Sequence, residues 1–402
     1  MSNLRFAPEF RLQIKGAPVP AALRSSISSV SLQTALEGAD RLEMSLVNEN
    51  LRWLDHPLLR MDNQIVFSLG YAPDPLVQMF VGTIVAHGPS FPSSGAPTLT
   101  VTAHDRREHL QEGTKDRWFG VSVPTVGNFP IPDMEVMRQV SVENQLTAVF
   151  EAVGAALAAI LGGIEAIPTI SDPKEAQKLI RSQSGESDFD LLTRIAKENG
   201  MEMLIEHDGP QGGTRLSFFS PLDHLKPDVS LKYGQSLLEF TPRISNVGQI
   251  ASVTIFIWVA EIKTQFSVTL GWDWDRMALT LNIGAGLVAG GSGPSEVVIN
   301  KPVSLASAPR KIVSELIPKL NKRLTGSGST IGDPKIRAGS VLRMEGLGTQ
   351  FGGLYRVTSA THTLDGSGYR TQFEVRKEIW FGSIPLGDQG AVPIRTQASF
   401  AN

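Results

Sequence analysis

Apolar and polar residues alternate with a period of two through much of this 402-residue chain. Near the N-terminus, Phe10, Leu12 and Ile14 alternate with polar residues, and the same pattern recurs as far as Asp105. A period of two is typical of a β-strand with one buried and one solvent-exposed face. Clusters of Pro and Gly separate the alternating segments and supply turns. The pattern predicts a first antiparallel β domain over residues 1–105.

Helical periodicity replaces the alternation after Asp105 and predicts a mixed α/β middle domain over residues 106–225. Ser187 and Asp190 have the spacing of a capping box, which begins a helix. Gly200 follows the last apolar residue of that pattern and ends the helix. The expected elements are a helix at residues 142–162, a helix from Ser187 to Gly200, and a hairpin of Met201–Ile205 with Leu216–Phe219.

Alternating patterns return and predict a second β domain over residues 226–381. A loop and a helix around residues 284–325 are inserted into it: Gly284–Pro294 is rich in glycine, and Ala308–Leu324 has an amphipathic pattern. Pro318 lies inside this helix, and a proline there usually kinks or ends it. Residues 382–402 show no regular periodicity, so we expect an extended C-terminal tail or partner-binding arm. The predicted fold class is mainly β with α+β insertions.

Composition excludes several kinds of partner and site. A net charge of −3 supplies no basic field of the kind that binds nucleic acid, so no nucleic acid partner is expected. The chain has no cysteine, which excludes disulfides and thiolate sites. The apolar run Ala152–Ile164 falls short of the ~20 residues that span a bilayer, so we expect no stable membrane insertion. The N-terminus lacks the apolar core of a secretory signal, which predicts assembly in the cytoplasm.

Two pairs of side chains have the residue types of a catalytic or metal site. Asp273 and Asp275 lie two positions apart and would share one face of a strand, as an acid and base pair could. Acidic residues near strand ends are more often solvated turn residues. His104 and His109 are five positions apart, whereas two histidines on one helix face are four apart. Neither pair therefore predicts a site.

Glycine, serine and tryptophan patterns do not predict a site either. The glycines between Gly284 and Gly291 superficially resemble a phosphate-binding loop, but no Lys-Ser or Lys-Thr follows them. No serine lies in a Gly-x-Ser-x-Gly elbow. Tryptophans are more often core or interface anchors than carbohydrate platforms. We apply this interpretation to Trp118, Trp258, Trp272, Trp274 and Trp380. The sequence predicts a non-enzymatic protein without catalytic, cofactor-binding or metal-binding residues.

The two β regions share an internal echo. Phe80 precedes His87 by seven positions, and Tyr355 precedes His362 by seven; in both regions a turn and an alternating strand follow. Two explanations are open: chance similarity between strands bounded by glycine, and duplication of one barrel. With duplication, three copies would present six barrels in a ring, which would match a sixfold tube on one side while keeping threefold symmetry on the other. His87 and His362 would then occupy equivalent strand positions with structural roles.

Several short motifs occur in a fixed order along the chain. The late ones are Thr325–Pro334, Ile336–Val341, Gly346–Gly348, Gly353–Tyr355, Thr361-His362 and Gly368-Tyr369. Earlier ones are Asp105-Arg106, Ser187–Leu192 and Asn199–Met201. From about residue 40 to residue 381 this order resembles the late control protein D family. That family includes tail hub proteins of contractile phages and the hub portion of valine-glycine-repeat spike proteins from type VI secretion and extracellular injection systems.

The resemblance implies two tube-protein-like antiparallel β-barrels plus a small mixed α/β domain, assembled as a homotrimer. Such a hub joins the sixfold tail tube to the threefold central spike, at the tail tip or baseplate of a phage or injection particle. Expected partners are the tail tube protein, other baseplate subunits and a separate spike protein, since residues 382–402 leave no room for a spike. The apolar helix at residues 142–162 and the segment Trp272–Asp275 depart from the family.

Two other functions stay open from the sequence. A tail-associated peptidoglycan hydrolase would need a catalytic Glu in a helical cleft domain, and no such domain is predicted. A carbohydrate-binding adhesion module is suggested only by the tryptophans and the β content. Cleavage of isolated peptidoglycan would favour the first, and glycan binding in the absence of other tail proteins would favour the second.

Overall fold

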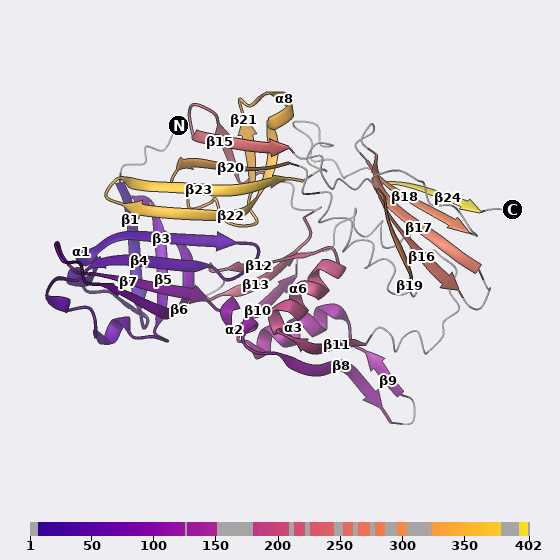
Figure 1. The fold of residues 1–402 in the computed structure, drawn as a ribbon, viewed down its shortest axis with the longest axis horizontal. Coiled ribbons are helices and arrows are strands. Elements are labelled where there is room, and N and C mark those ends of the chain that lie inside the picture. Colours follow the sequence, from indigo (N-terminus) through magenta and orange to yellow (C-terminus); the bar gives the residue numbers. More distant parts are fainter. Residues whose placement is uncertain are drawn as a thin grey trace.

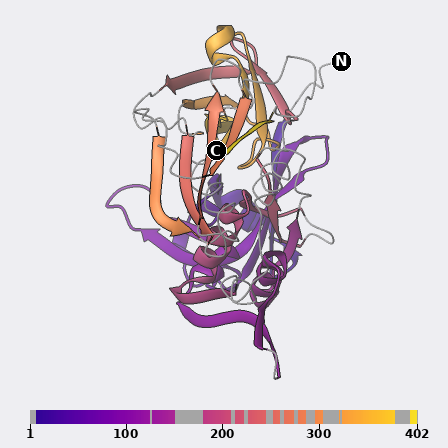
Figure 2. The same cartoon turned by 90° about the vertical axis from the view of Figure 1, so that its right-hand side faces the viewer.

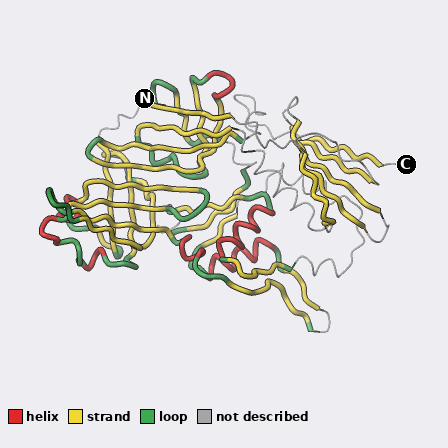
Figure 3. The backbone as a smooth tube through the Cα atoms, viewed as in Figure 1, coloured by secondary structure: helices red, strands yellow, loops and turns green. Residues whose placement is uncertain are grey.

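The computed structural model describes residues 7–124, 127–150, 180–208, 213–221, 226–244, 252–259, 264–273, 278–285, 296–303, 321, 324–378 and 394–400. Strands dominate these residues, and the longer helices gather in one region (Figure 3). The predicted fold class, mainly β with helical insertions, is confirmed. None of the helices within these ranges has the length and apolar character needed to cross a bilayer.

A first unit of five antiparallel strands has the sheet order β3-β4-β7-β6-β5. Alternate residues of each strand enter one core: Leu42, Met44 and Leu46 of β4 are all buried, as a period of two requires. The elements are α1 (Ala21–Ser26), β3 (Ile27–Ala35), β4 (Arg41–Val47), the 3-10 helices η1 (Glu49–Leu51) and η2 (Pro57–Leu59), β5 (Gln64–Ala72), β6 (Val77–Ser90) and β7 (Thr98–Asp105). β1 (Ala7–Ile14) and β2 (Ala17–Pro18) extend the sheet beyond β5.

A second unit of five antiparallel strands has the order β15-β20-β23-β22-β21. Its strands are β15 (Leu237–Ile244), β20 (Leu324–Ile331), β21 (Val341–Glu345), β22 (Gly353–Asp365) and β23 (Gly368–Lys377). The short helix α8 (Gly348–Phe351) joins β21 to β22, and β14 (Val229–Lys232) lies parallel to β21. Tyr355, Val357 and Phe373 belong to a separate apolar core inside this unit.

The two units repeat one topology. Taken in chain order, β3 to β7 correspond to β15, β20, β21, β22 and β23, and the two sheet orders are then identical. The echoed histidines lie on corresponding strands, since His87 is on β6 opposite β7 and His362 is on β22 opposite β23. The shared strand order favours duplication over chance.

An internal seam joins the units edge to edge (Figure 1). β3 of the first unit pairs antiparallel with the second half of β22, from Ala35 opposite Ser359 to Val30 opposite Leu364. The units therefore belong to one sheet of 13 strands.

A mixed α/β middle domain follows β7. Its helices are α2 (Arg107–Gln111), α3 (Asp133–Glu143) and α6 (Asp188–Glu198), and they pack with two small sheets around one apolar core. One sheet contains β8 (Lys115–Val123), β9 (Gly127–Pro130) and β11 (Arg181–Glu186); the other contains β10 (Thr147–Phe150), β12 (Glu202–Glu206) and β13 (Arg215–Phe219). Ser187 caps α6 by accepting the backbone N–H of Asp190 at 3.1 Å, which confirms the predicted helix start. The predicted hairpin is also confirmed as β12 and β13.

A fourth sheet has the order β19-β16-β17-β18-β24. Its strands are β16 (Ser252–Val259), β17 (Thr264–Asp273), β18 (Ala278–Ala285), β19 (Glu296–Val303) and β24 (Ile394–Phe400). In the chain, β16 to β19 lie between β15 and β20. At the corresponding place the first unit has only the short connection between β3 and β4. The quarter-turn view of Figure 2 shows this sheet in front of the other parts. β24 pairs in parallel with β18, so part of the expected C-terminal tail joins a sheet of its own chain.

The predicted helix at residues 142–162 is wrong at its start. α3 ends at Glu143, and Thr147–Phe150 instead forms β10, which pairs in parallel with β13. Local periodicity does not reveal this strand, because its partner lies far along the chain. Residues 151–162, and the predicted helix at Ala308–Leu324 apart from its final residues, lie outside the described residues. Leu324 itself begins β20.

Candidate functional site

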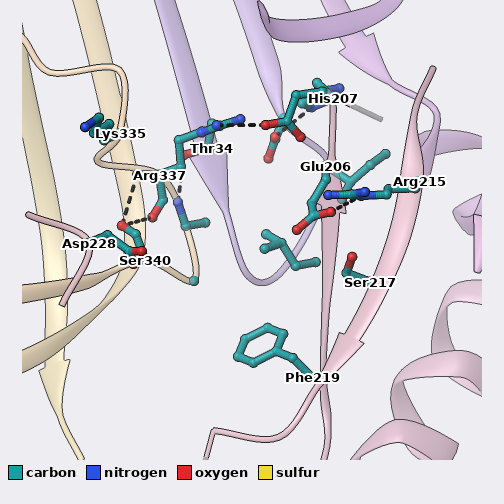
Figure 4. Close-up of a pocket in the computed structure, with 16 residues that line it drawn as sticks. Thr34, Glu206, His207, Arg215, Ser217, Phe219, Asp228, Lys335, Arg337 and Ser340 are labelled. Carbon is teal, nitrogen blue, oxygen red and sulfur yellow. Dashed lines mark hydrogen bonds and ion pairs between the residues drawn. The ribbon is translucent and has the colours of Figure 1, made fainter. Parts of the chain in front are cut away.

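A pocket of about 440 Å³ opens where the two units and the middle domain meet (Figure 4). Strands β12 and β13 supply one wall, residues 335–340 of the second unit supply another, and Thr34 of β3 contributes from the first unit. Gly339 approaches β12 so closely that an added Cβ would lie 3.0 Å from the Leu204 side chain. The pocket is therefore a gap between three parts of the fold.

Most charged side chains that line the pocket are paired within the chain. Arg337 Nη2 donates to Asp208 Oδ2 at 3.1 Å, and Arg215 pairs with Glu206 on the neighbouring strand. Asp228 Oδ2 accepts the first backbone N–H of β21 at 2.8 Å. A general acid or base must offer its proton-transfer atom to a substrate. In this pocket these carboxylates instead hold the walls together.

Two pocket residues belong to a buried charged cluster. Asp40 and His207 lie with Asp105 and Arg107, and all four side chains are almost fully buried. Arg107 Nε donates to Asp105 Oδ2 at 3.0 Å, and Arg107 Nη2 donates to Asp40 Oδ1. The backbone N–H of Asp40 donates to Asp105 Oδ2 at 2.8 Å. Because Arg107 begins α2 and His207 follows β12, the cluster fastens the first unit to the middle domain.

The cluster has the residue types of a metal site, since one ligand atom from each of Asp40, Asp105 and His207 lies within 4.8 Å of the others. His207 Nδ1 accepts the backbone N–H of Val81 at 3.1 Å, so the ring proton is on Nε2, which donates to Asp40 Oδ2 at 3.1 Å. Both ring nitrogens are thus engaged. Arg107 already supplies a positive charge between the carboxylates. These residues fit an ion-pair network and not a metal.

Burial and pairing act in opposite directions on the two carboxyl groups. Burial opposes the charge of Asp40, but Arg107 and His207 outweigh it and hold the pKa of Asp40 below its ordinary value. At Asp105 burial prevails and raises the pKa. Truncating one member of such a buried network costs about 3–5 kcal/mol, because a charge is left without its partner. The cluster therefore acts on stability.

A second buried cluster fastens the second unit to the middle domain. Arg356 of β22 donates from Nε to Glu378 Oε1 at 2.7 Å and from Nη2 to Glu378 Oε2 at 2.9 Å. Arg376 bonds both Glu378 and Glu202 of β12. Burial opposes the charge of Glu378, but Arg356 and Arg376 outweigh it and lower its pKa. The remaining Arg356 donors bond the carbonyls of Gly339 and Pro221 at 3.1 and 3.0 Å.

The histidine and aspartate pairs considered from the sequence do not form a site among the described residues. His104 Nδ1 lies 3.2 Å from Glu108, and His109 Nδ1 lies 3.2 Å from Glu112, so each histidine faces its own neighbouring glutamate. Asp273 is the last residue of β17, and Asp275 lies outside the described residues. Sequence reasoning missed both buried clusters. The only residue of the two clusters that stood out in the sequence was Asp105, as part of a motif and not as a charged group.

His362 is a buried core histidine. Its Nε2 donates to the backbone carbonyl of Ile336 at 2.9 Å, and Nδ1 lies 2.8 Å from Tyr369 Oη and 3.1 Å from Thr371 Oγ1. Burial lowers the pKa of His362 to about 4. This environment agrees with the structural role expected from the sequence.

The tryptophans and the glycine loop are described only in part. Trp118 lies on β8 with 51% of its surface exposed, and Trp258 and Trp272 lie on strands of the fourth sheet. Trp274, Trp380 and the loop residues 286–294 lie outside the described residues. Gly284 is part of β18, so the predicted loop starts later than expected.

Comparison with solved structures gives matches along nearly the whole chain. The 43 kDa tail protein of prophage MuSo2 from Shewanella oneidensis has a TM-score of 0.61 and 14% identity, over 93% of this chain and 99% of that one. A tail protein from Neisseria meningitidis has a TM-score of 0.61 and 11% identity, over 94% and 99%. A component of the type VI secretion system from E. coli has a TM-score of 0.56 and 12% identity, over 95% and 80%. These likenesses confirm a tail-protein fold.

Sequence comparisons add one match. No curated protein matches the chain. A family model described as the Alg8 N-terminal domain matches residues 165–366, half of the chain. The chain therefore belongs to the family of the Alg8 N-terminal domain, and its fold is that of phage tail proteins and a type VI secretion component.

Proposed function

We propose that this chain is the structural hub of a contractile tail or injection-system baseplate, a trimeric adaptor that joins the sixfold tail tube to the threefold central spike. The observation that carries the proposal is the repetition of one five-strand topology within a single chain. The fold shared with tail proteins supports the same assignment. Within the late control protein D resemblance, such a hub sits at the tail tip after assembly in the cytoplasm.

The repeat supplies the symmetry that an adaptor needs. Three copies with two like units each present six like units to a sixfold tube, while the middle domains keep threefold symmetry. Closed rings form when one surface binds a different surface and the rotation between copies closes. The tube protein would contact the ring of units, and a separate spike protein and other baseplate subunits would contact the remaining surfaces.

The two buried clusters suit a part that transmits force. Arg107 with its carboxylates holds the first unit against the middle domain, and Arg376, which also bonds Glu378, holds the second unit through Glu202. A charged group leaves such a buried network only at a large free-energy cost. The three parts would therefore move as one body during sheath contraction.

A non-enzymatic role is part of the proposal. The pocket between the units is lined by carboxylates that already pair with arginines or with backbone N–H groups. A glycoside hydrolase needs one carboxyl group that donates a proton and a second that attacks or activates water. These pocket contacts therefore give no support to the peptidoglycan hydrolase.

Native mass spectrometry tests the hub. The full-length chain is measured alone, then with the tube protein and the spike protein of the same particle, with a tube protein from an unrelated particle as control. We expect a trimer, alone or on addition of a partner, and a complex that contains all three proteins. A chain that stays monomeric and binds neither partner contradicts the proposal.

A further inference from the structure

Among the strand edges that are open in the described part of the chain, two match the two edges that form the internal seam. In that seam β3 pairs with the second half of β22. β3 corresponds to β15, and β22 corresponds to β6. Within the described ranges β15 forms a ladder only with β20, and residues 85–90 of β6 form one only with β7, since the backbone of the preceding Ile84 is bonded to Asp62 and Asn63. Open strand edges are templates for pairing with another chain.

The ladders fix which residues of the two seams correspond. Aligning His87 with His362 aligns Val101 with Thr371, because these are their partners on β7 and β23. The next strand then aligns Met44 with Thr330.

Continuing to the edge strands gives the equivalents of the seam residues. On the aligned strands, Leu42 lies two positions before Met44 and Gly328 lies two positions before Thr330. Leu32 of β3 lies opposite Leu42, and Phe240 of β15 lies opposite Gly328. Leu32 therefore corresponds to Phe240. By the same ladders Gln33 corresponds to Thr241.

We propose that β15 of one copy pairs antiparallel with residues 85–90 of β6 in the next copy, which repeats the internal seam between subunits. Leu32 faces His362 in the internal seam, so Phe240 faces His87 in the external one. Gln33 faces Thr361, so Thr241 faces Ala86. This pairing rests on the proposed hub, and it names the surface through which the copies join.

Side chains at the open edges have the environment of a half-formed seam. Leu32 is fully buried, whereas Phe240 is only partly buried, although it packs edge-on against Tyr355 with ring centres 5.4 Å apart. At the other edge Ala86 is exposed and His87 is only partly buried, whereas His362 is buried in the internal seam. The facing strand of a second copy covers these side chains.

The arrangement also favours a closed ring. Figure 1 places β15 and β6 at opposite margins of the joined units, so one copy can bind a neighbour on each side. The contact is heterologous, because two different edges meet. Pro242 on β15 and Pro89 on β6 lack the N–H that a ladder needs, and each lies just beyond the central pairs. The external ladder is therefore shorter than the internal one.

Cysteine cross-linking tests the register, and a chain without native cysteine makes the readout clean. The pair Ala86→Cys and Thr241→Cys is placed in one full-length chain, and disulfide formation is followed by non-reducing electrophoresis. Directly opposed residues of antiparallel strands bring their Cβ atoms within reach of a disulfide. The matched control is Gln33→Cys with Thr361→Cys, which occupies the same position in the internal seam. A second control, Ala86→Cys with Arg243→Cys, shifts the register by two residues.

We expect the external pair to link chains into covalent dimers and trimers, the internal pair to link within one chain, and the shifted pair to link much less. Native mass measured on the same samples separates the two proposals. Trimers in which the external pair stays reduced while the internal control closes overturn this seam and leave the hub standing. A chain that remains monomeric both alone and with the tube and spike proteins overturns the seam and the trimeric hub together.

Discussion

Acid should destabilise the fold through His362 before most carboxyl groups are protonated. The ring is buried in the second unit, and its Nδ1 has to accept hydrogen bonds from Tyr369 or Thr371, which a protonated nitrogen cannot do. Burial lowers the pKa of His362 to about 4, against 6.5 for a free histidine. Since the unfolded chain takes up this proton and the folded chain does not, stability falls as the pH drops from about 6.5 toward 4.

The size of the loss in stability follows from the pKa shift of His362. A depression from 6.5 to about 4 corresponds to roughly 3 kcal/mol once the pH is below both values. At pH 5.0 about 2 kcal/mol of this is already lost relative to pH 7.5. Carboxyl groups whose pKa is lowered by pairing, such as Asp188 and Glu378, lose their contribution only at lower pH. Asp105, whose pKa is raised by burial, is present in both the native chain and His362→Gln, so the difference between the two chains over the window from pH 7.5 to 5.0 reports the histidine.

Urea unfolding followed by circular dichroism measures the effect at pH 7.5 and 5.0 for the native chain and His362→Gln. The native chain should lose about 2 kcal/mol more than the variant over this interval. His109→Gln is the matched control, because His109 is half exposed and replacing it should leave the pH dependence unchanged. Equal pH dependence in the native chain and His362→Gln would refute the argument.

Three further predictions use unfolding free energies at pH 7.5. Arg107→Met leaves two buried carboxyl groups without their guanidinium and should cost about 3–5 kcal/mol, whereas Arg41→Met removes an exposed ion pair and should cost under about 1 kcal/mol. Gly82→Ala should cost on the order of 1–3 kcal/mol, because the added Cβ would lie 2.1 Å from a backbone oxygen of β7. Gly88→Ala, where the nearest atom is 3.6 Å away, is its neutral control. Ser187→Ala removes the cap of α6 and should cost about 1 kcal/mol.

Elements that depend on residues close together in the sequence could be predicted from it. Strands with one buried face show a period of two, and β4 buries Leu42, Met44 and Leu46 as that period requires. The start of α6 depends on Ser187 and Asp190, which are three residues apart. The echo between Phe80–His87 and Tyr355–His362 reflects a repeated strand topology, and the two histidines lie on corresponding strands, β6 and β22.

Elements that depend on distant partners could not be predicted in the same way. β10 is a strand because it lies beside β13, yet its own sequence, Thr147–Phe150, also fits the first half of an apolar helix. The cluster around Arg107 combines residues from β7 and α2 with the residue before β4 and the residue after β12, and no spacing along the chain predicts it. Such contacts become visible only when the fold brings the elements together.

The internal seam and the proposed external seam should differ in strength for a physical reason. The internal seam forms within one chain, so its strands meet at a high effective concentration and pay no cost of bringing two molecules together. The proposed external seam must offset that cost with a ladder that two prolines shorten. A single external contact would then be weak, whereas closing the ring adds a further contact without bringing in another molecule. Assembly should therefore be cooperative, with monomer and closed ring populated and open intermediates scarce as the concentration of the chain is raised.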